Sequence, residues 1–439
     1  MSLGRFTVAA CRERIAARNA ELRAVLRVLP EPDRDPDAAG GPLGGVPYVL
    51  KDTWDTAGIV TTGGSYRHRA RVPAASSHAH AALRRAGAVL LGKSNLCDLA
   101  FSTESDNHLG GPVRNPHDPA RTAGGSTGGG AAAVASGMAA FDWGTDFGGS
   151  IRAPAGYCGV VGLRLSHAAW PVGFEHFPRI SPFFHDFCGM GPLTTTVDDA
   201  AEVLAAVAPE LRASGAPTPE LSPDDVALYL PDDAHAGRWP SFGRDVRALL
   251  ADVGVRWSPA ELPAPETVND VFNGFLCAHF PEFIQGEELP IRQGAPAVLA
   301  SLLTWGRLDK RVHPNTALLL ATVALGHLTR YRDAARADEA LEHLRKCTAR
   351  VWSGGRLIVS PTCTELPPKH GRAAFDLTAM TFCKLGNAVD ATGVAIPFGT
   401  FDGTSLPRSL QVLGPPGSEG AVLDLARRLE RAISAMRAR

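Results

Sequence analysis

The chain contains two glycine-rich stretches, Thr122-Ala-Gly-Gly-Ser126-Thr-Gly-Gly-Gly130 and Gly144-Thr-Asp-Phe-Gly-Gly-Ser150-Ile-Arg152, and each surrounds one serine. The two serines lie 24 positions apart, and Lys51, in the segment Val-Leu-Lys-Asp, lies 75 positions before Ser126. Glycine is costly to order and has no side chain to pack. We therefore infer that these stretches bring backbone N–H groups close to a reacting atom. A lysine near two hydroxyls is one of the few ways to activate serine without histidine.

The bulk composition is that of a globular protein. Of the 439 residues, 45% are hydrophobic and 20% are charged, and the formal net charge is −1. This balance gives no reason to expect nucleic acid or a membrane as a partner. Residues 1–28 have apolar positions at helical spacing and are predicted to form a surface helix rather than a signal peptide. The eight cysteines are scattered singly, which favours reduced thiols in the cytoplasm and no metal site.

Helical and strand-like segments alternate along the chain. Residues 30–42 look like a loop, and short apolar strands are predicted at 46–51, 88–91, 355–361 and 394–399. Helices are predicted at 75–86, 130–140, 194–208, 317–349 and 419–437. This alternation predicts an α/β fold, in which helices cover both faces of a sheet. No internal repeat or long linker divides the chain, so we expect one domain.

Two motif matches are misleading. Residues 87–94 satisfy the phosphate-binding pattern G-x-x-x-x-G-K-[ST], but their middle residues are Ala-Val-Leu-Leu, which favour a strand over a phosphate-wrapping turn. Residues 124–128 satisfy the G-x-S-x-G nucleophile-elbow pattern. That elbow follows a strand, whereas residues 115–121 look like a loop, and His370 has no elbow context.

The chain resembles the amidase signature family, serine hydrolases of amides and esters that include fatty acid amide hydrolases and the glutaminase subunits of amidotransferases. The resemblance runs nearly end to end, and both spacings are similar to those of the family. It is carried by residues 44–52, 61–65, 87–95, 115–118, 124–130, 144–154, 158–164, 189–201 and 411–416.

The resemblance implies a single α/β domain over residues 1–439, with a large central mixed β-sheet covered by helices on both faces. The signature core spans about 44–205 plus 355–439, and a variable region of about 168–350 shapes the substrate pocket. No metal and no organic cofactor are implied.

Carried over residue by residue, the resemblance implies that Lys51 is the general base, Ser126 the bridging serine and Ser150 the nucleophile. For Lys51 to be neutral near pH 7–8, its pKa must fall by roughly 2–3 from about 10.4, which burial supplies. The backbone N–H groups of Phe147, Gly148, Gly149 and Ser150 are expected to face the developing oxyanion.

Other residues near the site have less direct roles. Thr127, where many relatives have serine, and Ala100, in the segment 100–106, are expected to contribute to the substrate site. Asp146 and Arg152 flank the nucleophile, and we expect an ion pair or a set of hydrogen bonds that stiffens the glycine loop rather than recognition of a substrate carboxylate by Arg152. Asp98 replaces a commoner glutamate, and no catalytic consequence is expected.

The function implied is hydrolysis of a carboxamide, or an ester, through a seryl-acyl intermediate. The bond is a carbon–nitrogen bond other than a peptide bond, the substrate is a small-molecule amide, and the acyl acceptor is water or an amine. The alternative is the glutaminase-type component of an amidotransferase complex, against which Ala153 weighs, since such components usually have glutamine there. A degenerate scaffold is disfavoured because Lys51, Ser126 and Ser150 are all retained.

The partner and the substrate are less well defined by the sequence. A homodimer is one option for the assembly. Aromatic residues between 168 and 340 form either the lining of an apolar acyl pocket or core, and core is favoured for each one. They are Trp170, Phe174, Phe177, Phe183, Phe184, Phe272, Phe275, Phe280, Phe283 and Trp305.

Overall fold

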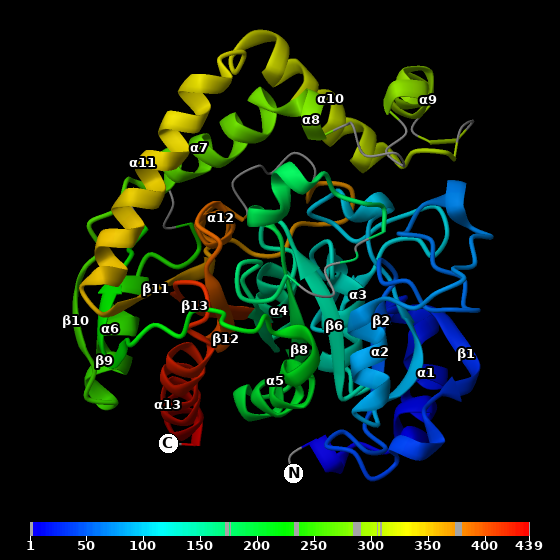
Figure 1. Ribbon diagram of the computed structural model, residues 1–439, viewed down its shortest axis with the longest axis horizontal. Helices are drawn as coiled ribbons and strands as arrows, with labels where there is room; N and C mark the ends of the chain where they lie inside the picture. Colours follow the sequence, from blue (N-terminus) through cyan, green and yellow to red (C-terminus); the bar gives the residue numbers. More distant parts are fainter. Residues whose placement is uncertain are drawn as a thin grey trace.

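The fold is built on an 11-stranded sheet with the order β1-β3-β2-β6-β8-β7-β12-β13-β11-β9-β10 (Figure 1). The structure is a computed structural model that describes residues 3–171, 175, 177–231, 237–283, 291–304, 306–307, 310–373 and 380–438. The strands of the sheet are β1 (Val25–Asp33), β2 (Pro47–Lys51), β3 (Val89–Ser94), β6 (Phe141–Asp146), β7 (Val161–Arg164), β8 (Gly189–Thr194), β9 (Ser222–Leu228), β10 (Arg256–Pro259), β11 (Arg356–Cys363), β12 (Thr392–Thr400) and β13 (Pro407–Gly414).

The sheet is mixed, as expected. Strand β2 runs parallel to both of its neighbours, β3 and β6. Strand β8 is antiparallel to β6, and β12 is antiparallel to β7 and β13. Because the carboxyl ends of parallel strands meet at one edge of a sheet, β2 and β6 bring their last residues together there.

Helices cover both faces of the sheet. The apolar side chains of one face, including Leu50, pack with those of α2, α5 and α13, such as Leu83 and Val203. Those of the other face, including Val49, pack with α3, through residues such as Ala131. The helices are α1 (Val8–Leu22), α2 (His78–Arg85), α3 (Gly128–Ala135), α4 (Arg152–Cys158), α5 (Val197–Leu211), α6 (Phe242–Asp252), α7 (Pro265–Ala278), α8 (Phe280–Phe283), α9 (Ile291–Thr304), α10 (Pro314–Thr329), α11 (Ala334–Ser353), α12 (Thr381–Ala388) and α13 (Glu419–Ala438).

The variable region supplies an arm outside the sheet. Helix α7 packs on α10 and on α11, and the three helices rise beyond the sheet in Figure 1. Helix α7 also packs on α12, and so the arm reaches the strand ends where the site lies. Within the described ranges, no helix is both long and apolar enough to span a bilayer.

Three local predictions were wrong. The helix predicted at 317–349 is two helices, α10 and α11, with residues 330–333 between them. The helix predicted over residues 1–28 ends at Leu22, because Arg23 adopts a left-handed conformation (φ 55°) and caps it. Val25 then begins β1, which includes part of the loop predicted at 30–42. The prolines at 30 and 32 misled that prediction, and they are tolerated because β1 is an edge strand. Residues 115–121 are also not a simple loop. They form β4 (Arg114–Asn115) and most of β5 (Asp118–Thr122), a small sheet apart from the main one.

The false phosphate-binding motif is a strand, as predicted. Residues 89–94 form β3, and every residue of that strand is buried. The Lys93 amine contacts the carbonyl of Trp54 and the hydroxyls of Thr56 and Thr61, the latter two at 3.1 and 3.3 Å. This lysine is therefore part of the core and does not project into a phosphate-binding loop.

Candidate active site

The site begins with Lys51, the last residue of β2. Its side chain is fully buried, with 0% exposure. Its Nζ atom lies 2.7 Å from Ser126 Oγ, 2.9 Å from Thr127 Oγ1 and 2.8 Å from Thr145 Oγ1. Three hydroxyls from two further elements, the start of α3 and the end of β6, therefore surround one amine.

The local backbone places Ser126 just before the N-terminus of α3. The Gly125–Ser126 peptide bond is cis, and Thr127 follows as the N-cap residue directly before the helix. The Ser105 hydroxyl donates to the Ser126 carbonyl at 3.1 Å and accepts from the Gly128 N–H at 3.0 Å. Ser105 thus fixes the backbone on both sides of Thr127.

Ser150 lies on the loop between β6 and α4, next to this cluster. The Thr127 N–H donates to the Ser150 carbonyl at 3.1 Å, which ties the two glycine-rich stretches together. Ser126 and Ser150 both line one pocket. The structure therefore brings Lys51, Ser126 and Ser150 into one neighbourhood.

Asp146 holds the loop that carries Ser150. Its carboxylate accepts hydrogen bonds from the N–H groups of Gly149 (2.9 Å), Ile151 (3.1 Å) and Arg152 (3.3 Å). The loop also needs glycine at 149, where φ is +112° and a Cβ would lie 2.6 Å from the Cβ of Cys383. The loop is therefore tightly determined.

Arg152 is buried and its guanidinium faces protein groups. Nε and Nη2 each donate to Asp146 at 3.1 Å, and other donors reach Asn387 Oδ1 (2.7 Å) and Gln411 Oε1 (2.9 Å). Burial acts to raise the pKa of Asp146, but Arg152 and Arg164 outweigh it and hold this pKa well below its usual range. The geometry fits an ion pair that supports the loop, and Arg152 does not line the pocket.

One expected oxyanion donor is already engaged. Because the Gly149 N–H donates to Asp146, it is not available to a substrate oxygen, contrary to the expectation from the sequence. Phe147, Gly148 and Ser150 line the pocket. Within the described residues, no hydrogen bond is formed by the N–H of Gly148 or of Ser150.

The environment of Lys51 favours its neutral form. Burial lowers the pKa of Lys51 from 10.5 to about 8, while nearby Cys97, Asp142 and Asp146 act in the opposite direction. This fall matches the size expected from the sequence. Asp52 follows Lys51 directly but turns away, and its carboxylate accepts from the N–H of Thr62 at 3.0 Å.

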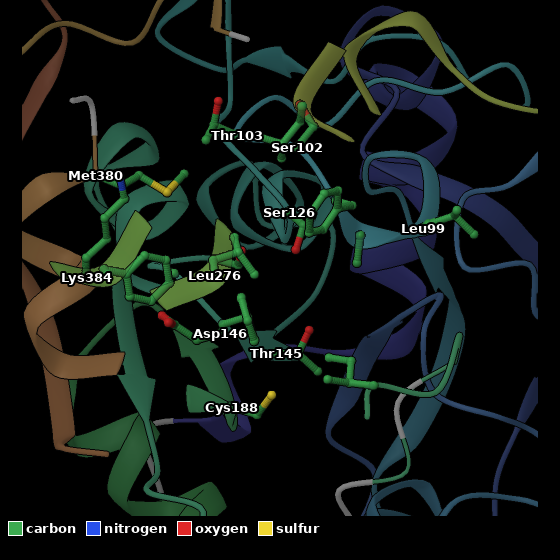
Figure 2. Close-up of a pocket in the computed structure, with 18 of the residues that line it drawn as sticks. Leu99, Ser102, Thr103, Ser126, Thr145, Asp146, Cys188, Leu276, Met380 and Lys384 are labelled. Carbon is green, nitrogen blue, oxygen red and sulfur yellow. The ribbon is translucent and has the colours of Figure 1, made fainter. Parts of the chain in front are cut away.

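The pocket beside the serines has mostly apolar walls. Figure 2 shows Ser126 and Thr145 near its centre, with Met380 and Lys384 on one side and Leu99 on the other. Ala100 also lines it, in a left-handed conformation (φ 58°), whereas Thr127 does not line it and contacts Lys51 instead. The further apolar lining includes Phe101, Phe147, Ile180, Phe272, Leu276 and Leu319.

The predicted aromatic residues divide between pocket and core. Phe272 lines the pocket, and Phe184 and Phe275 pack around it in a buried cluster. Trp170 belongs to the core on one face of the sheet. Phe177 and Phe280 are buried and Phe183 is exposed, while Phe174, Trp305 and the side chain of Phe283 lie outside the described residues.

Thr145 was not predicted from the sequence, although it contacts Lys51 as closely as Thr127 does. The signal that could have found it is the strand order, because Thr145 is close to Lys51 only if β6 lies beside β2. Lys384 was not predicted either; it lines the pocket, and its amine lies 3.2 Å from Asn273 Oδ1.

Comparison with known proteins identifies the family to which this chain belongs. The model of the amidase family matches residues 7–423, and the chain belongs to this family. The A-type component of the glutamyl-tRNA(Gln) amidotransferase of Anaeromyxobacter sp. is 30% identical, over 98% of this chain and 89% of its own. The protein of the same name from Maridesulfovibrio salexigens is 29% identical, over 97% of this chain and 93% of its own.

Solved structures agree with this assignment. The crystal structure of an amidase has a TM-score of 0.74 and 26% identity, covering 98% of this chain and 96% of its own. 6-Aminohexanoate cyclic dimer hydrolase with its substrate has a TM-score of 0.77 and 23% identity, covering 97% and 92%, and shows the shared fold alone. The protein is thus an amidase-family hydrolase of carbon–nitrogen bonds in non-peptide amides.

Proposed function

We propose that the protein hydrolyses a small-molecule carboxamide, with Ser150 as nucleophile, Ser126 as proton bridge and Lys51 as general base. The observation that carries this proposal is the buried amine of Lys51, 2.7 Å from Ser126 Oγ and surrounded by hydroxyls. A neutral amine there accepts the proton of Ser126, which in turn accepts that of Ser150.

The hydrogen-bond directions around Lys51 support proton transfer from Ser126 to Lys51. The Thr127 hydroxyl donates to the Thr145 carbonyl at 3.3 Å, so the Thr127 oxygen accepts from Lys51. A second Lys51 N–H points to Thr145 Oγ1. A neutral amine has two N–H groups and one lone pair, and the lone pair is then left for the proton of Ser126.

The reaction proceeds in two balanced steps. Ser150 Oγ attacks the amide carbonyl and its proton passes through Ser126 to Lys51. Collapse of the intermediate breaks the C–N bond, and the proton returns through Ser126 to the leaving nitrogen. Water or an amine then attacks the acyl-serine and regenerates the free hydroxyl.

Backbone N–H groups of the loop after β6 serve the oxyanion in this proposal. We assign Phe147, Gly148 and Ser150 to this role and exclude Gly149, because its N–H is held by Asp146. Asp146 and Arg152 act by fixing the loop.

The pocket supports a substrate with an apolar acyl or aryl part, since Phe272, Leu276 and Leu319 line it. We place the enzyme in the cytoplasm, acting on a free small molecule, with a homodimer as one option for the assembly. The signature core of about 44–205 plus 355–439 carries the catalytic groups, and the region of about 168–350 contributes the arm.

The test combines active-site labelling with turnover. A fluorophosphonate should label the wild-type protein. It should label Lys51→Ala and Ser126→Ala more slowly than the wild type, and it should not label Ser150→Ala. A panel of aryl, alkyl and amino-acid amides then identifies the substrate class. Unchanged labelling of Ser150→Ala, or near wild-type turnover by Lys51→Ala, refutes the assignment.

A second candidate is the glutaminase-type component of an amidotransferase complex, which the names of the relatives favour. Two observations weigh against it: Ala153 stands where such components usually have glutamine, and the pocket walls are mostly apolar. Release of ammonia from glutamine, and failure to turn over apolar amides, would support this candidate.

A further inference from the structure

A buried carboxylate that the mechanism does not use lies beside the base. Asp142, the second residue of β6, is fully buried with 0% exposure. Its Oδ1 atom accepts a hydrogen bond from Ser94 Oγ at 2.7 Å, and among the described residues its Oδ2 atom has no hydrogen-bond partner. Leaving a carboxylate oxygen buried without a partner is costly, so the group requires an explanation.

The register places Asp142 on the same face of the sheet as Lys51. Asp142 is opposite Val49 in β2, and Ser94 of β3 is opposite Lys51. Paired residues on neighbouring strands share a face, as do residues two apart on one strand. Strand β2 lies between β3 and β6. The hydrogen bond from Ser94 to Asp142 therefore crosses over β2, on the face of the sheet to which the Lys51 side chain also points.

Helix α3 closes this face and leaves room for the carboxylate. A Cβ at Gly130 would lie 2.3 Å from both Cγ and Oδ2 of Asp142. The segment Gly128–Ala135 contains only glycine, alanine and valine, so the helix brings no charge to Asp142. Asp142 occupies the space that a side chain at 130 would otherwise take.

We propose that Asp142 is a positioning residue that acts on Lys51 as a buried counter-charge and makes the Lys51 amine take up a proton more readily. The proposal rests on the proposed role of Lys51 as general base. It adds a carboxylate that stabilises the ammonium formed on Lys51 while Ser150 attacks.

The other charged groups around Lys51 do not replace Asp142. Asp146 is neutralised by Arg152, at 3.1 Å, and by Arg164. Burial raises the pKa of Cys97 to about 12, so this thiol is protonated. On the opposite face, Asp52 lies 3.8 Å from Lys93.

The titration behaviour agrees with this geometry. Burial raises the pKa of Asp142 to about 7, and the Ser94 hydrogen bond and the charges of Lys51 and Lys93 act against that rise. Near pH 8, where Lys51 titrates, the Asp142 carboxylate is therefore mostly ionised. Because an opposite charge favours the protonated amine, removing it should lower the pH at which Lys51 loses its proton.

Asp142→Asn tests the proposal, with the pH dependence of kcat/KM as the first measurement. The acid limb should move to lower pH by about one unit, so the fraction of plateau activity present at pH 7 should rise about fivefold. The plateau itself should fall, because a less basic amine is a weaker base. An unchanged acid limb, or a move to higher pH, overturns the proposal.

A measurement that needs no turnover separates this proposal from the proposed function. The chain has six lysines, so the 13Cε resonance of Lys51 can be assigned by its loss in Lys51→Met and followed against pH. The resonance should titrate about one pH unit lower in Asp142→Asn. If Lys51→Ala stays active, the proposed function fails, while this titration still decides whether Asp142 acts on Lys51.

Two further variants support the interpretation, one as an alternative to Asp142→Asn and one as a control. Asp142→Ser also removes the charge, is smaller, and should give the same shift if Asp142→Asn does not fold. Asp199→Asn is the matched control: Asp199 is buried, pairs with Arg5 at 2.7 Å, and lies on α5, against the other face of the sheet. It should leave the titration of Lys51 unchanged, and an equal shift in this control contradicts the proposal.

Discussion

Thr145→Val is the sharpest test of the hydroxyl cluster around Lys51. Valine has nearly the shape of threonine, so the substitution removes one hydroxyl, 2.8 Å from Lys51 Nζ, and leaves the packing in place. When Lys51 takes up the proton of the relay, it becomes a charged donor to this hydroxyl. A hydrogen bond to a charged group contributes about 1.5–3 kcal/mol, and one between neutral groups about 0.5–1.5 kcal/mol. Because the bond is already present to the neutral amine, only the difference of about 1–1.5 kcal/mol acts on the reaction, which corresponds to a fall in kcat of about 5- to 13-fold.

The assay is steady-state turnover of the best amide from the panel, with thermal unfolding to show that the variant is folded. The loss should be in kcat, because the interaction strengthens as Lys51 becomes charged and does not bind the ground-state substrate. Thr145→Ser keeps the hydroxyl and should retain most of the activity. A fall of less than about threefold in kcat, or a loss confined to KM, refutes the argument.

Three further predictions concern the base and the loop. The kcat/KM should rise with pH through about 8, where Lys51 becomes neutral, and a profile that is flat from pH 6 to about 9 contradicts Lys51 as base. Gly149→Ala should lower both stability and kcat, since φ is +112° and the new Cβ meets Cys383 at 2.6 Å; the cost should be about 2 kcal/mol or more in chemical denaturation. Arg152→Met removes the nearer of the two arginines beside buried Asp146 and leaves Arg164 at 3.9 Å. The unfolding free energy should fall by about 3 kcal/mol, the lower end of the range for breaking a buried ion pair, whereas a loss below about 1 kcal/mol points to a solvated carboxylate.

The parts of the site predicted from the sequence are those coded by local pattern. Lys51 ends a short apolar run, which predicted a buried strand, and β2 is buried throughout. The Ala-Val-Leu-Leu run likewise predicted β3 and excluded a phosphate loop. Burial of Lys51 followed from its strand, and so did the expected fall of its pKa.

The parts that were missed depend on which strands are neighbours. Thr145 and Asp142 are both near Lys51 because β6 lies next to β2, and no local pattern contains that order. The engagement of the Gly149 N–H was missed for another reason. Asp146 was expected to stiffen the loop with Arg152 through an ion pair or a set of hydrogen bonds, but which backbone N–H groups its carboxylate accepts from depends on the loop conformation itself.

The two buried lysines of neighbouring strands show why a lowered pKa does not by itself make a base. Burial lowers the pKa of both Lys51 and Lys93 to about 8. Because Lys93 is paired with Leu50 in the register, it points to the face opposite Lys51. There it contacts the Trp54 carbonyl, two threonines and Asp52, all within the core. Of these two lysines, only Lys51 has a serine hydroxyl at hydrogen-bond distance beside a pocket. Position relative to Ser126, and not the pKa, therefore distinguishes the proposed base.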